Sequence, residues 1–387
     1  MRILIINSVC GIRSTGRICT DLADALCKEG HEVRIAYGRE IVPQKYKKYA
    51  TRIGNTFSVK EDMLLSRLFD NAGFNSKTAT RKFVAWIKEY DPDIIHLHNI
   101  HGYYLNVEIL FEYLKECGKK IIWTLHDCWP FTGHCSYFDF AKCNGWQSGC
   151  KNCIQSREYP KSLFVSRSEL NFERKEKAFT NVPYMSIITP SYWLAGLVKE
   201  SFLKGYPIRV IHNGIDTNIF KPTKSDILLR YHLEDKHIVL GVASFWSQRK
   251  GLKYFLQLSD MLPDQYRIVL IGLSKKQIEK LPPKITGLLK TNSVQELVEW
   301  YSAAEVFVNP TLEENYPTTN IEAQACGTPV ISFKTGGSVE SANSFGVSVE
   351  QGNVTEIVRC IKDREYLIED LDRSVQGMLN QYIELFS

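Results

Sequence analysis

The sequence contains no apolar run that approaches the ~20 residues needed to span a bilayer as a helix. It also lacks the basic segment and apolar core of a signal peptide, because Met1 leads directly into the short apolar stretch Ile3–Ile6 and then into polar residues. Strong net charge is absent too: the 387 residues carry +5, which is too little to argue for nucleic acid. We therefore expect a cytoplasmic protein without a nucleic-acid partner.

The small positive excess is concentrated in one stretch. Between Arg39 and Glu89, eleven basic residues stand against five acidic ones, so this stretch alone accounts for the net charge of the chain. A basic patch can bind anionic lipid headgroups, with each nearby cation contributing about 1 kcal/mol. It can equally be the solvated face of ordinary helices. The sequence leaves open whether the protein lies peripherally on the cytoplasmic face of the inner membrane.

Short apolar strands alternate with amphipathic helices from the first residues onward. A strand over Arg2–Asn7, a loop over Ser8–Gly16, a helix over Arg17–Glu29 and a strand over Val33–Ala36 form a β-α-β unit. Such a unit predicts a parallel sheet with crossover helices. Further strands are predicted at Ile94–Leu97, Ile121–Thr124, Ile187–Thr189, Arg209–Ile211, Ile238–Gly241, Arg267–Ile271, Val306–Val308 and Val330–Ser332, and further helices at Lys253–Met261 and Val294–Ala303.

The alternation restarts after Tyr192, and the chain is too long for one hydrophobic core. We therefore expect an α/β protein of two Rossmann-like, doubly wound domains. The first covers residues 1–190 and the second residues 191–364, with a hinge near Pro190–Leu197. In open parallel sheets, ligands bind beyond the carboxyl ends of the strands, so site residues are expected in the loops that follow strands.

Two glutamates, Glu314 and Glu322, are separated by seven residues and flank a predicted helix start. The first turn of that helix would be formed by Tyr316, Pro317, Thr318 and Thr319. A helix amino terminus offers free N–H groups and a partial positive charge, which suit a diphosphate. Glu322 can accept hydrogen bonds from ribose hydroxyls, and Glu314 from sugar hydroxyls. The alternative is that both are ordinary acids on a solvated loop and helix face.

Besides the two glutamates, the sequence contains Gly327-Thr328-Pro329-Val330, Asn213-Gly214-Ile215-Asp216, Thr189-Pro190-Ser191, and Gly336-Gly337 with Glu340. With these motifs in this order, the chain resembles the retaining Glu-x7-Glu glycosyltransferases (glycosyl transferases group 1, family 4), which have the GT-B fold. The resemblance covers nearly the full length. It implies two domains that face each other across a cleft, the first binding the acceptor and the second a nucleotide sugar, UDP- or GDP-linked. It also implies that C-terminal helices, at about residues 365–387, pack back on the first domain.

The resemblance assigns roles to several residues. Lys250 would meet the donor diphosphate, and His126 would reach the transferred sugar. Gly16 and Asn213 are carried over as donor-binding residues. The family usually has an arginine a few residues before this lysine, where the chain has Ser244-Phe245-Trp246; Arg249 would supply that cation, or is a surface arginine. His126 could also be a core histidine. His96, His98 and His101 correspond to a His-x-His region without metal, and are interpreted as packing and acceptor-side residues.

A cysteine-rich insert, at about residues 128–160, follows His126-Asp127. Cys150-Lys151-Asn152-Cys153 has the spacing of half a structural zinc site, and Cys135 and Cys143 could complete a set of four thiolates, with His134 as an alternative ligand. Buried, inert cysteines are the competing interpretation. The insert resembles one found in a subgroup of bacterial polysaccharide-assembly enzymes.

The function that the resemblance implies is retaining transfer of a hexose from a nucleotide sugar to a glycan acceptor. The subgroup points to a lipid-linked acceptor in the synthesis of capsule, exopolysaccharide or O-antigen. No catalytic divalent metal is expected, because Asp91-Pro92-Asp93 precedes a buried strand and no other Asp-x-Asp is found in a suitable loop. Two alternatives stay open: a GT-B enzyme that epimerises a nucleotide sugar, and a non-catalytic nucleotide-binding component of an assembly complex.

Overall fold

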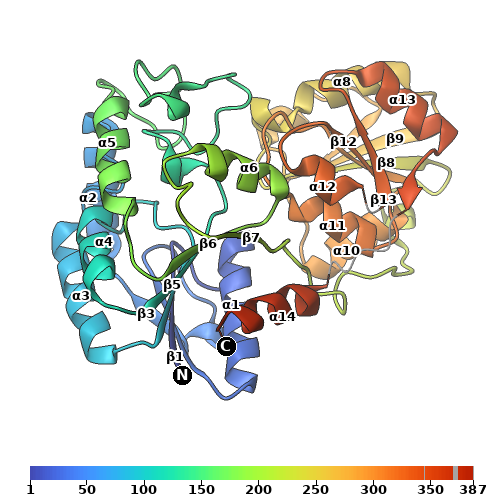
Figure 1. Cartoon of the computed structure of the whole chain (residues 1–387). Coiled ribbons are helices and arrows are strands. Elements are labelled where there is room, and N and C mark those ends of the chain that lie inside the picture. The colour runs from blue at the N-terminus through green and yellow to red at the C-terminus, as the bar shows by residue number, and fades with distance from the viewer. Residues whose placement is uncertain (344, 369–373, 387) are drawn as a thin grey trace. The chain divides into compact units, whose positions relative to one another are not determined.

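The computed structural model describes residues 1–343, 345–368 and 374–386, and the chain divides into two compact units (Figure 1). The first unit consists of Met1–His212 together with the C-terminal residues from Leu379 onward. The second unit is Asn213–Met378. Each is a doubly wound α/β unit, as the alternation of strands and helices predicts.

The first unit is built on a seven-stranded parallel sheet in the order β3-β2-β1-β4-β5-β6-β7. Its central strands are apolar on both faces, which is typical of strands covered by helices on both sides. The strands are β1 (Arg2–Asn7), β2 (Glu32–Tyr37), β3 (Ala50–Arg52), β4 (Ile94–Leu97), β5 (Lys120–Thr124), β6 (Met185–Thr189) and β7 (Ile208–Val210).

Helices cover both faces of this sheet. Figure 1 shows α2 to α5 on one side and α1 on the other. On the α4 and α5 side, the rings of Phe111 and Phe179 lie 4.5 Å apart, and Trp123 meets Phe179 edge-on at 5.0 Å. The helices are α1 (Arg13–Lys28), α2 (Thr56–Phe69), α3 (Lys77–Tyr90), α4 (Val107–Glu116), α5 (Ser168–Phe179) and α6 (Tyr192–Glu200), with 3-10 turns η1 (Gln44–Tyr46), η2 (Trp129–Phe131) and η3 (Gly145–Gln147).

The second unit repeats the plan with the order β10-β9-β8-β11-β12-β13-β14, in which only β14 is antiparallel. The strands are β8 (His237–Val242), β9 (Tyr266–Ile271), β10 (Ile285–Leu288), β11 (Val306–Asn309), β12 (Val330–Phe333), β13 (Phe345–Val349) and β14 (Leu367–Ile368). The helices are α7 (Ile227–Arg230), α8 (Leu252–Met261), α9 (Lys275–Ile278), α10 (Val294–Ala303), α11 (Thr318–Ala325), α12 (Ser338–Ala342) and α13 (Val354–Asp363), with the 3-10 turn η4 (Gln248–Lys250).

The last helix, α14 (Val375–Phe386), begins in the second unit and ends in the first. In the first unit, the hydroxyl of Tyr382 lies 3.1 Å from the hydroxyl of Thr124, at the end of β5. The ring of Tyr382 also packs on the imidazole of His96. Of the C-terminal segment expected to return to the first domain, residues 369–373 and 387 lie outside the described residues.

The predicted boundary between the domains is too early by about twenty residues. The first unit continues through α6 and β7 to His212, because β7 pairs in parallel with β6 and completes the first sheet. In both sheets the strand order reverses between the first strand and its later neighbour, between β1 and β4 and between β8 and β11. Loops that leave the carboxyl ends of such strand pairs are the places where open α/β sheets bind ligands.

Candidate active site

In the second unit, two loops leave the sheet at the point where the strand order reverses. The loop after β8 contains η4 with Arg249 and Lys250, and the loop after β11 contains Glu313 and Glu314. Gly251, between η4 and α8, has a φ of 78°, and a Cβ at this position would lie 2.1 Å from the carbonyl oxygen of Pro310. The Lys-Gly pair therefore lets one loop lie directly against the other.

Hydrogen bonds join these two loops. The backbone N–H of Leu312 donates to the carbonyl oxygen of Arg249 at 2.8 Å. The Arg249 guanidinium in turn donates to the carbonyl oxygen of Glu313 at 2.7 Å. Arg249 is thus not a loose surface side chain: its backbone and its guanidinium both hold the glutamate loop.

The two charged residues predicted to serve the donor are paired with each other. The Lys250 ammonium donates to Oε2 of Glu314 in a half-buried ion pair. Burial by itself would raise the pKa of Glu314, but the charges of Lys250 and Arg249 outweigh it, so the pKa of this carboxyl is lowered. Glu314 is therefore ionised at neutral pH, and it neutralises one of the two cations of the site.

Glu322 lies on α11 and is 4% exposed. Its Oε2 accepts a hydrogen bond of 3.0 Å from the hydroxyl of Tyr301, a buried residue of α10. Tyr301 is a contact that no sequence motif indicated. Since the Glu-x7-Glu spacing sets Glu314 in the loop and Glu322 inside the helix, the two acids occupy different surroundings: one faces cations and the other a phenol.

The helix start between the glutamates falls at Thr318 and Thr319. Pro317 precedes the first turn and provides no side-chain cap. Tyr316 is buried, and its carbonyl oxygen lies 3.5 Å from the side-chain nitrogen of Asn213. The predicted set from Tyr316 to Thr319 is therefore divided: Thr318 and Thr319 begin α11, whereas the side chain of Tyr316 belongs to the core.

The Asn213-Gly214 pair connects this helix to the start of α14. A Cβ at Gly214 would lie 2.4 Å from the carbonyl oxygen of Ser374, so only glycine permits this approach. Ile215 forms a β-bridge with Ser374, and the N–H of Val375 donates to the Ile215 carbonyl at 2.7 Å. Within the second unit, the Asn213-Gly214-Ile215 segment is therefore held against the start of α14.

In the first unit, His126 follows β5 and lies within hydrogen-bonding distance of a second histidine. Its Nε2 is 2.9 Å from Nδ1 of His98, which follows β4. Burial lowers the pKa of His126 to about 4 and holds the pKa of His98 well below its usual value. Both rings are therefore neutral at pH 7, and one carries the shared proton. The ring of His96 packs on that of His98, with centroids 4.2 Å apart. His96 is buried, and its Nε2 lies 2.8 Å from the Thr124 hydroxyl.

Gly16 lies in a helix and not in a loop, which corrects the sequence prediction. α1 begins at Arg13, so Gly16 occupies its first turn. Its carbonyl accepts a hydrogen bond of 3.0 Å from the N–H of Gly11, which has a φ of 71° and is the glycine that shapes the loop. A Cβ at Gly16 would come within 3.1 Å of the Val9 side chain, so a larger residue there would require Val9 to shift slightly.

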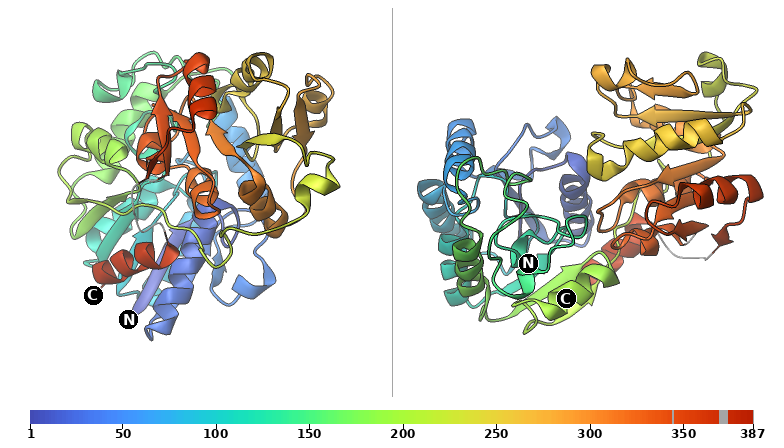
Figure 2. Two further views of the ribbon diagram at one scale, coloured as in Figure 1. Left: turned by 90° about the vertical axis from the view of Figure 1, so that its right-hand side faces the viewer. Right: turned by 90° about the horizontal axis from the view of Figure 1, so that it is seen from above.

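The insert between β5 and α5 consists of loops with two 3-10 turns, η2 and η3 (Figure 2). A cavity of about 20 Å³ is lined by the four predicted zinc ligands, Cys135, Cys143, Cys150 and Cys153. Among the described residues, however, no three His, Cys, Asp or Glu side chains are arranged to hold a metal ion. The structure gathers the four cysteines but does not give them a ligand geometry, so the zinc site stays a prediction.

Two buried side chains, His134 and Lys175, attach the insert to the first unit. His134, the alternative zinc ligand, places Nδ1 2.5 Å from Oδ1 of Asp70 at the end of α2, so it already has a carboxylate partner. Lys175 of α5 donates to the carbonyl oxygens of Trp129 and Thr132 at 2.8 and 2.9 Å. Burial lowers the pKa of Lys175 to about 7. Neither contact has a local sequence signal.

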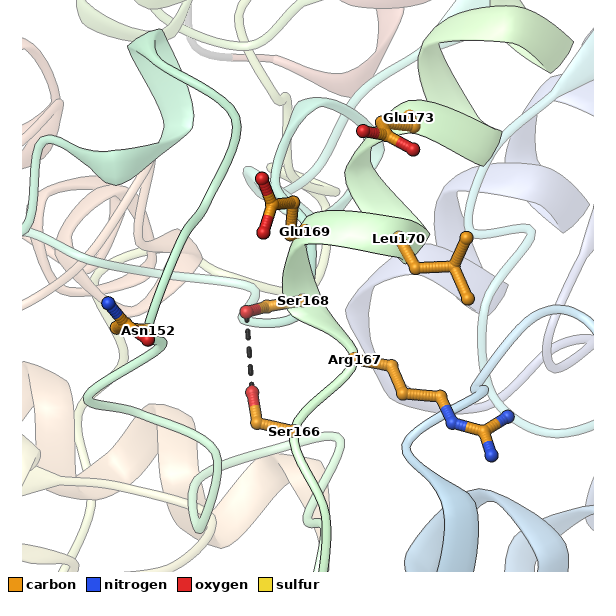
Figure 3. Close-up of a pocket in the computed structure, with 7 residues that line it drawn as sticks. All are labelled: Asn152, Ser166, Arg167, Ser168, Glu169, Leu170 and Glu173. Carbon is orange, nitrogen blue, oxygen red and sulfur yellow. Dashed lines mark hydrogen bonds between the residues drawn. The ribbon is translucent and has the colours of Figure 1, made fainter.

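A separate cavity of about 440 Å³ lies beside the insert, where Asn152 faces the start of α5 (Figure 3). Figure 3 shows Ser166 and Ser168 directed toward each other, with 3.3 Å between their hydroxyls. Glu169, also in the lining, pairs with Lys151 at 3.2 Å. None of the predicted site residues lines this cavity.

Comparison with known proteins decides the family. Residues 15–219 match the family described as Glycosyltransferase Family 4, and residues 236–364 match the one described as Glycosyl transferases group 1. The chain belongs to glycosyltransferase family 4. This family 4 enzyme is 23% identical over 313 residues to the glycosyl transferase WcaC of Escherichia coli K12, whose name assigns it to colanic acid biosynthesis; the match covers 78% of this chain and 74% of the relative.

A second relative of this family 4 chain is the O-antigen chain mannosyltransferase RfbU of Salmonella typhimurium LT2. The two are 25% identical over 246 residues, or 60% of each chain. Among solved structures, the sucrose-phosphate synthase of Thermosynechococcus elongatus superposes with a TM-score of 0.68 at 16% identity, covering 100% of this chain and 98% of that one. Anabaena HepE in complex with UDP-glucose gives 0.65 at 16%, with 100% and 99% covered.

These matches establish the GT-B fold and identify the protein as a glycosyltransferase, as the motifs predict. Among the residues that the structure describes, none of the helices combines the length and the apolar character that crossing a bilayer requires.

Proposed function

We propose that this family 4 glycosyltransferase transfers a hexose, with retention of anomeric configuration, from a UDP- or GDP-linked donor to a lipid-linked glycan in bacterial surface polysaccharide synthesis. The observation that carries the proposal is the group of Arg249, Lys250 and Glu314 where the second sheet reverses its strand order. The names of WcaC and RfbU support the pathway class, and the UDP-glucose complex of HepE supports the donor class.

The chemistry would depend on stabilising the departing nucleotide diphosphate. In the proposed mechanism, Lys250 and Arg249 provide positive charge, and the first turn of α11 adds the N–H groups of Thr318 and Thr319. Glu314 would turn from its pairing with Lys250 toward the sugar hydroxyls when the diphosphate takes over the ammonium. Glu322 would accept from ribose hydroxyls while Tyr301 holds its other side. In the first unit, the neutral His126 would donate to a sugar hydroxyl, and acceptor attack would occur on the same face as the leaving phosphate.

Glu322→Ala is expected to reduce nucleotide affinity and transfer by at least about tenfold while leaving the fold intact, because a carboxylate that bonds ribose contributes a charge-assisted hydrogen bond. Wild-type and variant protein should be titrated with a panel of UDP and GDP sugars, with binding followed by thermal shift and transfer by nucleotide release. Glu299→Ala, at a half-buried acid of α10 that pairs with Arg230, is the control. Normal turnover in the Glu322 variant would contradict this part of the site.

Incubation with donor alone separates the remaining candidates. An epimerase would convert the nucleotide sugar to its epimer without any acceptor, and a non-catalytic component would bind the nucleotide and leave the donor unchanged. A transferase without acceptor releases nucleotide slowly, because the sugar passes to water instead. Chromatography of the nucleotide products after incubation with donor alone therefore separates the three candidates before the acceptor is known.

Peripheral membrane contact is proposed through α2. Phe57 and Leu64 are 76% and 57% exposed, and Lys60 and Arg67 alternate with them at three- and four-residue spacing, so the four side chains share one helix face. Such a face can bind an anionic phospholipid membrane, because the apolar side chains enter the headgroup region and the cations are attracted to the headgroups. This face belongs to the stretch that carries the excess positive charge of the chain.

The protein is therefore expected to sediment with vesicles that contain anionic phospholipid, and binding should weaken as salt increases. Replacing Phe57 and Leu64 together by serine should lower the bound fraction several-fold. Leu229→Ser, a similarly exposed leucine on α7 of the second unit, is the control. Equal binding of all three proteins would exclude α2 as the contact surface.

The zinc prediction is tested by metal analysis. Protein purified without exposure to chelator should contain one zinc per chain if Cys135, Cys143, Cys150 and Cys153 bind the ion as thiolates. Burial raises the pKa of Cys153 to about 11, so ligation would require a metal charge to remove the proton. Protein free of zinc would mean that the insert is held by its aromatic core and by the contacts of His134 and Lys175 alone.

A further inference from the structure

Five side chains of the first unit form a cluster, four of them in the loops that follow β2, β4 and β5 of the first sheet. We call it the Tyr159 cluster. Its members are Arg39 after β2, His101 and Tyr103 after β4, Asp127 after β5, and Tyr159 from the end of the insert. In this type of sheet, the loops that follow strands are where ligands bind. The proposed transfer chemistry assigns none of the five a role.

A chain of hydrogen bonds runs through the cluster. Asp127 accepts from the N–H of Trp129 through Oδ1 at 3.0 Å, and its Oδ2 lies 3.0 Å from Nε2 of His101. Nδ1 of His101 lies 3.1 Å from the hydroxyl of Tyr159. Burial would raise the pKa of Asp127, but His101 and the Trp129 N–H lower it, so the carboxylate is ionised and takes the proton-bearing Nε2 of the ring as its partner.

This chain orients the Tyr159 hydroxyl. Nδ1 of His101, 3.1 Å away, holds the phenol oxygen in place. A tyrosine hydroxyl can donate one hydrogen bond and accept others, so capacity remains to bond a ligand. His101 and Asp127 are buried, whereas Tyr159 is 41% exposed as a whole residue, although burial of its hydroxyl raises its pKa. The network therefore runs from the interior to a partly exposed tyrosine whose hydroxyl the protein holds in place.

Aromatic rings and a cation flank this hydroxyl. The ring of Tyr103 meets that of Tyr159 edge-on, with centroids 6.1 Å apart, and the Arg39 guanidinium lies 5.9 Å from the Tyr103 centroid. Tyr103 has a φ of 69°, a left-handed backbone conformation that bulky residues rarely adopt. Among the described residues, no carboxylate forms an ion pair with Arg39.

We infer that the Tyr159 cluster is a subsite for a glycosyl phosphate: the Tyr159 hydroxyl hydrogen-bonds to a sugar hydroxyl, the aromatic edge packs against the ring, and Arg39 binds the phosphate. A planar guanidinium suits phosphate oxygens, and an oriented phenol beside a second ring suits a sugar. The inference rests on the proposed function, because a glycan attached to a lipid through phosphate presents both groups. Tyr159 would make the insert part of acceptor recognition.

The test measures binding of hexose 1-phosphates (glucose, galactose, mannose and N-acetylglucosamine 1-phosphate) by saturation-transfer NMR in the presence of saturating UDP or GDP, whichever binds. At least one should bind. Tyr159→Phe should weaken it about three- to tenfold through the lost hydrogen bond, and Arg39→Gln by at least about tenfold. The corresponding methyl hexosides should bind more weakly and be insensitive to Arg39→Gln.

Controls separate this inference from the proposed function. Tyr184→Phe, at an exposed tyrosine elsewhere in the first unit, should leave hexose phosphate binding unchanged. All variants should retain wild-type nucleotide affinity. Failure of the wild type to bind any nucleotide would count against the proposed function. Normal nucleotide binding with no hexose 1-phosphate bound, or with binding equal in wild type, Tyr159→Phe and Arg39→Gln, would overturn the Tyr159 subsite alone.

Discussion

Replacing Lys250 by methionine should lower kcat/KM for nucleotide release by about a hundredfold or more. The reason is electrostatic, since removing a positioned group that stabilises developing negative charge typically costs a factor of about 10²–10³. In this chain the substitution has a second effect, because Glu314 loses the partner that holds its pKa down while its burial remains. The pKa of Glu314 must then rise, and the group that should bind the sugar becomes partly protonated toward acid pH.

Lys253→Met is the matched control for this substitution. Lys253 is an exposed lysine of α8, three residues further along, with its ammonium over the ring of Tyr254. It should retain wild-type kcat/KM. If Lys250→Met stays within threefold of the wild type, the diphosphate is held elsewhere.

Glu314→Gln separates the two roles of Lys250. This variant keeps the size of the side chain and removes the charge that neutralises the ammonium. If Lys250 binds the diphosphate, free UDP or GDP should bind the glutamine variant at least as tightly as the wild type and the methionine variant more weakly. If Lys250 only orients Glu314, the two variants should lose transfer equally and bind the free nucleotide alike.

The ion pair between Lys250 and Glu314 illustrates what the sequence can predict. Both residues were identified from motifs, since each follows an apolar strand and parallel strands end at the same edge of a sheet. Their pairing was not predicted, because it depends on the close approach of Gly251 to Pro310. The contact between Tyr301 and Glu322 likewise joins residues of two different helices, so no local pattern in the sequence indicates it. The burial of Lys175 has no local signal either.

The fold followed from periodicity where the strands are buried and apolar. α10 was predicted at its observed bounds, and β1 likewise. The missed strands are β3, β10, β13 and β14, which lie at or next to the edges of their sheets. The first three contain polar residues or glycine, and β14 has only two residues. An edge strand is covered less completely, so it needs no continuous apolar run and gives a weak pattern. The domain boundary was misplaced for a related reason: β7 has only three residues, and its pairing with β6 is what assigns it to the first unit.

Asp70→Asn is expected to lower the free energy of unfolding of the first unit by about 3 kcal/mol, because two buried donors share this side chain as their acceptor and one of them would lose it. Asp70 ends α2 and accepts from His134 at 2.5 Å and from the N–H of Arg167 at 2.6 Å. Asparagine retains one acceptor oxygen, so one of the two donors would face an amide nitrogen. Asparagine also tolerates the left-handed φ of 50° at this position, which removes backbone strain as a cause.

Asp91→Asn provides the matched comparison. Asp91 ends α3 in the same left-handed conformation, with a φ of 47°, but it is exposed and pairs with Lys119 at the surface. Urea unfolding followed by tryptophan fluorescence should show a shifted first transition for Asp70→Asn and a transition close to wild type for Asp91→Asn. Because His134 belongs to the insert, limited proteolysis of Asp70→Asn should cut first within residues 128–160. Equal midpoints for the two variants would mean that the insert is held without the buried pair, by Lys175 and the aromatic core.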